Sequence, residues 1–271
     1  MLDAWTASPP RFREDANAED DLALGGYRDR LVVELAQNAS DAAGSGGRLT
    51  LSYDDGVLTA ANTGAPLDAS GVSALATLRA SAKRSGRTVG RFGVGFAAVA
   101  AVSDEVVIAS TSGAVRFSRQ ATYDEVHARA SLDGELTARS GRVPLLRLPW
   151  PSDETPPPGF DTVVRIVVRP DAVASVEAML AAVDPTLLLV LPGLSRLSVG
   201  HRVIEVTSVE DDVLLDGLRW RVQRGSGSLE AALLADRPVE EQSQTEWSVT
   251  WAVPVDADGV PQPVDLSLIH I

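Results

Sequence analysis

One amphipathic stretch, Glu34-Leu-Ala-Gln-Asn38-Ala-Ser-Asp41-Ala, constrains this chain of 271 residues more than any other. We predict that it forms the middle of a helix from about residue 28 to residue 43. At about 100° per residue, Glu34, Asn38 and Asp41 share one face, because they are spaced i, i+4 and i+7. The neighbouring stripe is apolar: Leu31, Leu35, Ala39 and Ala42. Polar groups at the rim of a core suggest a site.

Two glycine-containing segments follow this helix. Asn62-Thr-Gly64-Ala-Pro66 comes after a strand-like run, and Gly90-Arg-Phe92-Gly93-Val94-Gly95-Phe96 opens a run of small apolar residues. In order and spacing, the three segments resemble the N, G1 and G2 boxes of the GHKL superfamily of ATPases (gyrase, heat-shock chaperone, histidine kinase, MutL). Within it they look most similar to the ninety-kilodalton heat-shock chaperones and the sacsin-type ATP-binding modules. The resemblance covers residues 28 to 168.

The resemblance implies a fold and a division of the chain. The expected fold is α+β of the Bergerat type, a two-layer α/β sandwich in which helices cover one face of a mixed sheet. Residues 1–27 would be an N-terminal arm that covers the sheet, and residues 28–170 the ATP-binding domain. Residues 171–271 would form a smaller, mostly β segment, and the apolar end of the chain suggests that this segment is incomplete.

Composition and charge argue against several classes of protein. A net charge of −13 and a pI near 4.6 disfavour a surface for nucleic acid or anionic membrane, because such surfaces need clustered cations. Without cysteine there is neither a disulfide framework nor a thiolate nucleophile. The N-terminus does not look like a signal peptide, and the longest apolar run is too short to span a bilayer. We expect a soluble, cytoplasmic protein.

Periodicity and turn residues predict the order of the elements. The expected helices are a short one before Gly25-Gly26 and others near 67–80, 93–102 and 172–183. The expected strands lie near 48–53, 57–61, 105–110, 114–119, 161–168, 203–209, 218–224 and 247–255. Residues 120–160 are expected to be less regular, forming either an insertion or a long connection, and residues 187–199 a strand or a mixed segment.

The first segment carries residues suited to ATP hydrolysis, which needs a base to activate water and cations to screen the phosphates. Glu34 is the predicted base. The amide oxygen of Asn38, one turn later, is the predicted Mg²⁺ ligand, because Mg²⁺ prefers oxygen and keeps several waters. Asp41 is expected to brace the nucleotide pocket without a catalytic role. Alone, such a triplet would indicate only a solvated helix face, and the glycine segments change that interpretation.

The G2 segment is the predicted phosphate cradle. Gly90, Gly93 and Gly95 let backbone N–H groups approach phosphate oxygens where a Cβ would clash. A helix starting at Gly93 would add its free N-terminal N–H groups. The resemblance adds three neighbours to the predicted nucleotide site: Phe92, Val94 and Phe96.

A basic loop precedes this cradle. Lys83, the only lysine of the chain, lies with Arg84 and Arg87 between the G1 and G2 segments of an otherwise acidic protein. A charge run of this kind is often a solvated surface loop. Its position favours a lid over the phosphates, with Lys83 as a phosphate contact.

The G1 segment and a later strand supply the predicted adenine side. Asn62 stands where the superfamily usually has an aspartate, and Pro66 replaces the second glycine of that box. An amide can still read adenine, at a cost of about 1 kcal/mol for the lost charge assistance. Gly64 and Thr162 complete the predicted set, although Thr162 is also an ordinary strand residue.

The expected function is Mg²⁺-dependent binding and slow hydrolysis of ATP, driving lid closure in a chaperone-like or remodelling protein. A client protein and a homodimer of the full-length protein are the expected partners. The alternative is a nucleotide-binding switch with little hydrolysis, favoured by Asn62 and Pro66. A histidine kinase is disfavoured because the histidines all follow the glycine boxes: His127, His201 and His270. The acidic balance disfavours a DNA-repair or topoisomerase relative.

Overall fold

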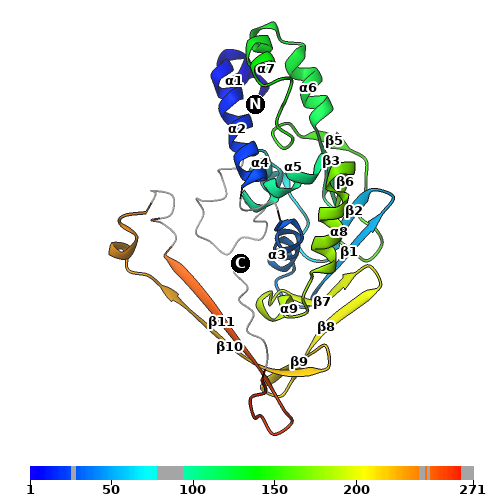
Figure 1. The fold of residues 1–271 in the computed structure, drawn as a ribbon, viewed down its shortest axis with the longest axis vertical. Coiled ribbons are helices and arrows are strands. Elements are labelled where there is room, and N and C mark those ends of the chain that lie inside the picture. Colours follow the sequence, from blue (N-terminus) through cyan, green and yellow to red (C-terminus); the bar gives the residue numbers. More distant parts are fainter. Residues whose placement is uncertain (26–28, 78–93, 238–241, 243–244, 264–271) are drawn as a thin grey trace.

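One large mixed sheet organises the chain (Figure 1). The computed structural model describes residues 1–25, 29–77, 94–237, 242 and 245–263. The strands within these ranges are β1 (Gly47–Asp54), β2 (Val57–Asn62), β3 (Ser103–Ser110), β4 (Gly113–Ser118), β5 (Trp150–Ser152), β6 (Thr162–Val168), β7 (Leu194–Val199), β8 (Arg202–Val209), β9 (Asp212–Leu215), β10 (Leu218–Ser228) and β11 (Glu246–Val255). Their order across the sheet is β11-β10-β9-β8-β7-β1-β2-β6-β3-β4-β5.

The helical elements of the described ranges alternate with these strands, so the fold is α+β, as expected. They are α1 (Leu2–Ala7), α2 (Pro9–Leu24), α3 (Leu31–Ala43), α4 (Ala69–Thr77), η2 (Val94–Ala98), α5 (Val99–Val102), α6 (Arg119–His127), η3 (Ala130–Leu132), α7 (Asp133–Ala138), η4 (Pro170–Ala172), α8 (Val173–Ala181), α9 (Leu187–Val190) and η5 (Ala231–Leu234), with η marking 3₁₀ turns. None of them is long and apolar enough to cross a bilayer.

Local turn chemistry explains the β1–β2 hairpin that the sequence predicted. Asp55 and Gly56 join the two strands with φ angles of 49° and 78°. A tight turn between twisted strands needs positive φ at both central residues, which glycine adopts freely and aspartate tolerates. The register pairs Asp54 with Val57 and, at the far end, Leu49 with Asn62. The turn thereby fixes where Asn62 lies at the end of β2.

The sheet continues beyond residue 170. β7 pairs with β1 in parallel, whereas the other strand pairs of the described ranges are antiparallel. The first half of β8 pairs with β7 and its second half with β9. The division of the chain near residue 170 stays a prediction, and a single sheet runs across it.

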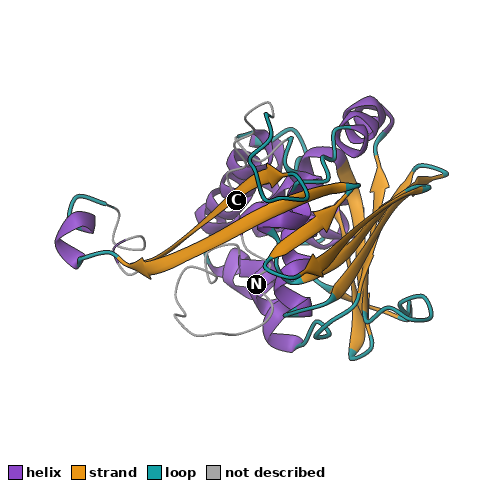
Figure 2. Ribbon diagram, turned by 90° about the horizontal axis from the view of Figure 1, so that it is seen from below, coloured by secondary structure: helices purple, strands orange, loops and turns teal. Residues whose placement is uncertain are grey.

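The main core lies between the sheet and the helices that Figure 2 shows gathered on one side of it. Residues of β6 illustrate the two faces: Val164 and Ile166 are 3% and 0% exposed, whereas Val167, between Ile166 and Val168, is 48% exposed. Side chains alternate across a strand, so at these positions one face is buried and the other faces water. Val163, on the same face as Val167, is buried in a small cluster with Ala61 and Ala109. Helix α3 packs on the face of Val164 and Ile166, against β1, β2 and β7.

A second, smaller core lies among α1, α2, α6, η3 and α7, at the end of the molecule that carries the N-terminus (Figure 1). Its buried members are Trp5, Phe12, Val126, Leu132, Leu136, Val143 and Leu148. The segment over 120–160, which the sequence predicted to be less regular, therefore contains the short helices α6 and α7 and contributes to a core. The short helices α6 and α7 bury their few apolar residues against Trp5 and Phe12, which lie more than 100 residues away, and no local pattern reveals such a partner.

The N-terminal arm is more helical than the single short helix that was expected. Helix α2 packs on η2, α5 and α7, so it covers the elements that follow the G2 segment. The predicted helix over 93–102 is divided into the 3₁₀ turn η2 and the short helix α5, and β9 was missed by the sequence. Ala97 and Ala98 of η2 are fully buried. Their small side chains let the backbone of this turn pack closely on its neighbours.

Glu19 fastens this arm to the rest of the protein. Its side chain is buried, and its two carboxylate oxygens accept hydrogen bonds from the backbone N–H groups of Leu145 and Leu146 at 2.5 and 2.9 Å. Burial, the larger effect, raises the pKa of the carboxyl group, whereas these two hydrogen bonds lower that pKa. These hydrogen bonds between residues far apart in the sequence hold α2 against the segment that follows α7.

Glu19→Gln is expected to lower the free energy of unfolding by about 1–3 kcal/mol, because an amide NH₂ group would then face a buried backbone N–H. Urea denaturation measures the change. Glu14→Gln on the exposed side of the same helix is the matched control and should change little. Equal midpoints for the two variants would contradict the anchoring role of Glu19.

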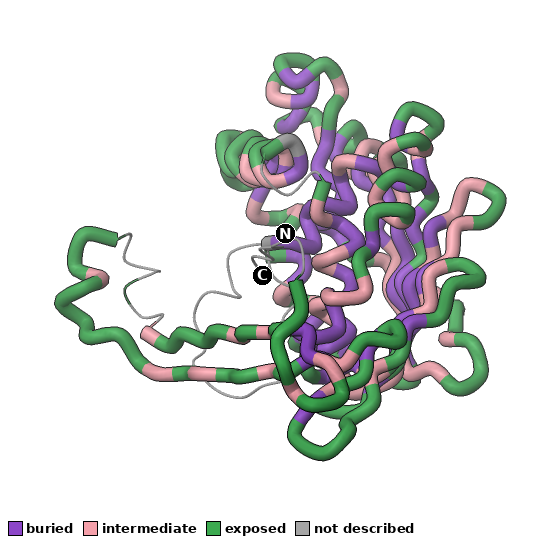
Figure 3. The backbone as a smooth tube through the Cα atoms, turned by 60° about the horizontal axis from the view of Figure 1, so that its bottom comes forward, coloured by how far each residue is buried: buried purple, intermediate pink, exposed green. Residues whose placement is uncertain are grey.

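Burial is concentrated in the body of the protein, whereas the β10–β11 ribbon extends from it with few buried residues (Figure 3). The described part of the ribbon exposes alternate apolar side chains of β11: Trp247, Val249, Trp251 and Val253. Their spacing places them on one face of the strand. None of the predicted site residues lies in this ribbon.

Candidate functional site

The most informative contact joins Glu34 of α3 to Gly95 of η2. A Cβ placed on Gly95 would lie 1.8 Å from Glu34 Oε2 and 2.2 Å from its Cδ. The carboxylate therefore occupies the space that any side chain at position 95 would fill. These residues are 61 positions apart in the chain, and the fold brings the predicted base against the backbone of the predicted phosphate cradle.

Glu34 is largely withdrawn from water, and its side chain is 13% exposed. Burial raises the pKa of its carboxyl group, and the positive charge of Arg30 lowers that pKa in part. Arg30 Nε lies 4.0 Å from Glu34 Oε1. A carboxylate with a raised pKa is a stronger base than one in water, which suits proton abstraction near neutral pH.

Asn38 lies one turn further along α3, with a buried amide nitrogen that makes no hydrogen bond within the described residues. An unpaired buried polar group is costly, so it suggests a missing partner. A half-turn of the terminal amide places its oxygen at this position instead. Asn38 can therefore present an oxygen to a cation or a donor to an anion.

Asn62 and Thr162 lie side by side at the end of the β2–β6 pair. Both are buried, at 8% and 4% exposure. The amide nitrogen of Asn62 donates to the carbonyl oxygen of Thr63 at 3.3 Å, which leaves its side-chain oxygen as the acceptor. The predicted adenine-side residues thus share one small region of the sheet.

Gly64 connects this region to the end of α3. Its φ is 134°, and a Cβ would lie 2.5 Å from the carbonyl oxygen of Ala42. The backbone N–H of Gly64 donates to Asp161 Oδ2 at 2.8 Å, and that of Ala65 donates to the same Ala42 oxygen. A side chain at position 64 would force the G1 segment away from the helix.

Sequence reasoning missed two residues of this arrangement. Asp161 holds Gly64 by the hydrogen bond above, and Arg30 faces Glu34. The i, i+4 spacing of Arg30 and Glu34 was a usable signal, because residues four apart are neighbours on a helix. No local pattern could have linked Asp161 to Gly64, since 97 positions separate them.

The other residues of the predicted nucleotide site lie elsewhere on these elements or outside the described residues. Asp41 is exposed on α3, and the ring of Phe96 lies in the main core at 1% exposure. Val94 begins η2. The other members of the predicted set lie outside the described residues: Lys83, Gly90, Phe92 and Gly93. No group of three or more His, Cys, Asp or Glu side chains that could hold a metal ion occurs in the described ranges.

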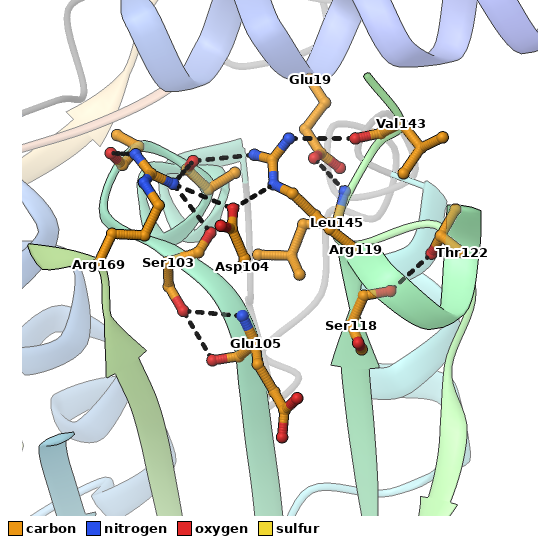
Figure 4. Close-up of polar contacts among 12 residues, drawn as sticks. Glu19, Ser103, Asp104, Glu105, Ser118, Arg119, Thr122, Val143, Leu145 and Arg169 are labelled. Carbon is orange, nitrogen blue, oxygen red and sulfur yellow. Dashed lines mark hydrogen bonds and ion pairs between the residues drawn. The ribbon is translucent and has the colours of Figure 1, made fainter. Parts of the chain in front are cut away.

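A separate open cavity of about 470 Å³ is lined by three arginines, Arg119, Arg142 and Arg169, but by none of the predicted site residues. Arg119 and Arg169 both pair with Asp104, at 3.0 and 3.2 Å (Figure 4). They also donate to backbone carbonyls at the end of α5. Two of the three cations therefore already have structural partners, and the cavity is a weaker candidate than the region around Glu34.

Neither a scan against protein-family models nor a search of curated proteins found a match to this chain. The residues around Glu34 are therefore the features of this chain that point to a function.

Proposed function

We propose that this protein binds ATP with Mg²⁺ and hydrolyses it slowly, with Glu34 as the general base. The contact between the Glu34 carboxylate and Gly95 carries the proposal. A base must lie within reach of the water that attacks the terminal phosphate, and backbone N–H groups must surround that phosphate. A partly buried carboxylate against the backbone of Gly95 is compatible with both requirements.

The roles of the residues follow from their chemistry. An oxygen of the Glu34 carboxylate accepts the proton of the attacking water, and its raised pKa supports that role. Asn38 would hold Mg²⁺ through its amide oxygen, which a half-turn of the amide brings to the place of the buried, unpaired nitrogen. When bound, Mg²⁺ supplies charge that screens the phosphate oxygens. Asn62 and Thr162 would receive the adenine.

The fold is consistent with this proposal at the coarser level of an α+β protein with one mixed sheet. The finer assignment, a Bergerat-type ATP-binding domain, remains part of the proposal. It is supported by the order of the three motifs and by the packing of α3 against both η2 and the end of β2. A role in a chaperone-like or remodelling cycle rests on the resemblance of the motifs.

The first test is calorimetry of ATP binding with and without Mg²⁺. We expect Mg²⁺ to tighten binding to the wild type and Asn38→Ala to lose about tenfold of the Mg²⁺-dependent affinity. Gln37→Ala, which removes a neighbouring amide of the same helix, is the matched control and should retain it. Absence of ATP binding at millimolar concentration would refute the proposed function.

A nucleotide-binding switch with little hydrolysis is the second candidate. The observation that favours it is the amide at Asn62, which is buried and already donates to Thr63. An amide forms a weaker hydrogen bond to adenine than a carboxylate does. Phosphate release distinguishes the two: ATP binding with turnover at background would support the switch.

A further inference from the structure

We propose that Arg30 is a positioning residue whose ion pair with Glu34 holds the carboxylate turned towards Gly95. The inference goes beyond the proposed function and rests on it, because it assigns a task to Glu34. The two oxygens of the carboxylate face different neighbours. Oε1 lies 4.0 Å from Arg30 Nε, and Oε2 lies against the backbone of Gly95.

The backbone fixes Arg30 relative to Glu34. Arg30 occupies the N-cap of α3, and its carbonyl oxygen accepts the hydrogen bond of the Glu34 N–H at 2.9 Å. The same residue therefore begins the helix and places a guanidinium beside Glu34. The two side chains are 32% and 13% exposed, so water screens their attraction less than on an open surface.

Arginine is a poor choice for the helix itself. N-caps favour Ser, Thr, Asp or Asn, whose side chains accept a hydrogen bond from the first turn, and Arg30 makes no such bond. A cation at this end also opposes the helix dipole. Arg30 is thus unfavourable for the stability of α3 and lies beside the candidate site, which suggests that it is present for a functional reason.

The described surroundings of Glu34 carry few other charged groups. Helix α3 itself carries Asp41, and the elements that pack on it carry a few ionisable side chains, namely Arg48, Tyr53 and Asp54 on β1, Arg196 on β7 and Glu177 on α8, whereas η2 and β2 carry none. Among the described residues, Arg30 is the charged group whose field lowers the pKa of Glu34. Burial acts in the opposite direction. Without Arg30, Glu34 would be protonated at a higher pH.

The test compares Arg30→Gln, Arg30→Lys and Arg129→Gln. Arg129, at the N-cap of η3, pairs with Glu125 of α6 at i, i+4, outside the site, so its replacement controls for the loss of an ion pair of the same spacing. In Arg30→Gln we expect the acid limb of the pH profile of ATP turnover to move up by about one pH unit. Arg30→Lys should restore most of the shift, and Arg129→Gln should leave the profile unchanged.

A second readout separates this proposal from the proposed function. NMR titration of the ¹³C-labelled Glu34 carboxyl in the absence of ATP measures its pKa without turnover. A raised pKa in Arg30→Gln with an unchanged pH profile would support the action of Arg30 and reject Glu34 as the base. An unchanged pKa would overturn the proposal for Arg30, whatever the turnover.

Discussion

Glu34→Gln is expected to reduce the rate of ATP hydrolysis by about 10²- to 10⁴-fold, the usual contribution of a general base. Glutamine keeps the size of the side chain and its place against Gly95, but its amide cannot serve as the proton acceptor. ATP affinity should change far less, because the base acts mainly in the transition state. Single-turnover phosphate release and calorimetry measure the two quantities. Wild-type release in this variant would exclude Glu34 as the base.

The same substitution is expected to raise the thermal stability at neutral pH. Because burial raises the pKa of Glu34, the folded protein binds this proton more tightly than the unfolded chain does. The contribution of Glu34 to stability therefore falls as pH rises from its ordinary pKa through the raised one. Glutamine does not ionise, so the gain in Tm should disappear below the ordinary pKa. Thermal denaturation over a pH series checks both the sign and the window.

Gly95→Ala is expected to lower turnover by about 100-fold while the protein still folds. The added Cβ would overlap the Glu34 carboxylate, which must rotate away. The overlapping atoms are the end of a flexible side chain, so the cost in folding should be small. Phosphate release and thermal denaturation measure these effects. Gly134→Ala is the control, because a Cβ there meets nothing within 4 Å.

A double-mutant cycle tests whether Gly95 acts through Glu34. If the Cβ acts only by displacing the carboxylate, Gly95→Ala should have no further effect on turnover in a Glu34→Gln background. Groups that act as one unit show such non-additivity. Fully additive losses would mean that Gly95 contributes separately, for example through its backbone near the phosphates. Unchanged turnover in Gly95→Ala alone would contradict the arrangement of the site.

Local patterns predicted much of the secondary structure. The 3.6-residue period gave α3 to within a few residues, and Asp55-Gly56 gave the β1–β2 hairpin. The β-branched run at 162–168 gave β6. These features depend on neighbours a few positions apart, where propensity and turn chemistry dominate. The helices within 120–160 were missed because their stability comes from packing against Trp5 and Phe12.

The sequence by itself determined that Glu34 and Asn38 share a helix face, since residues four apart are always neighbours on a helix. It also determined the turns, through residues that accept positive φ. Only the tertiary structure decided that Glu34 lies against Gly95, that Asp161 holds Gly64, and that β7 pairs with β1. The physical reason is range: periodicity acts over a few residues, whereas these contacts join segments that only the packed core brings together.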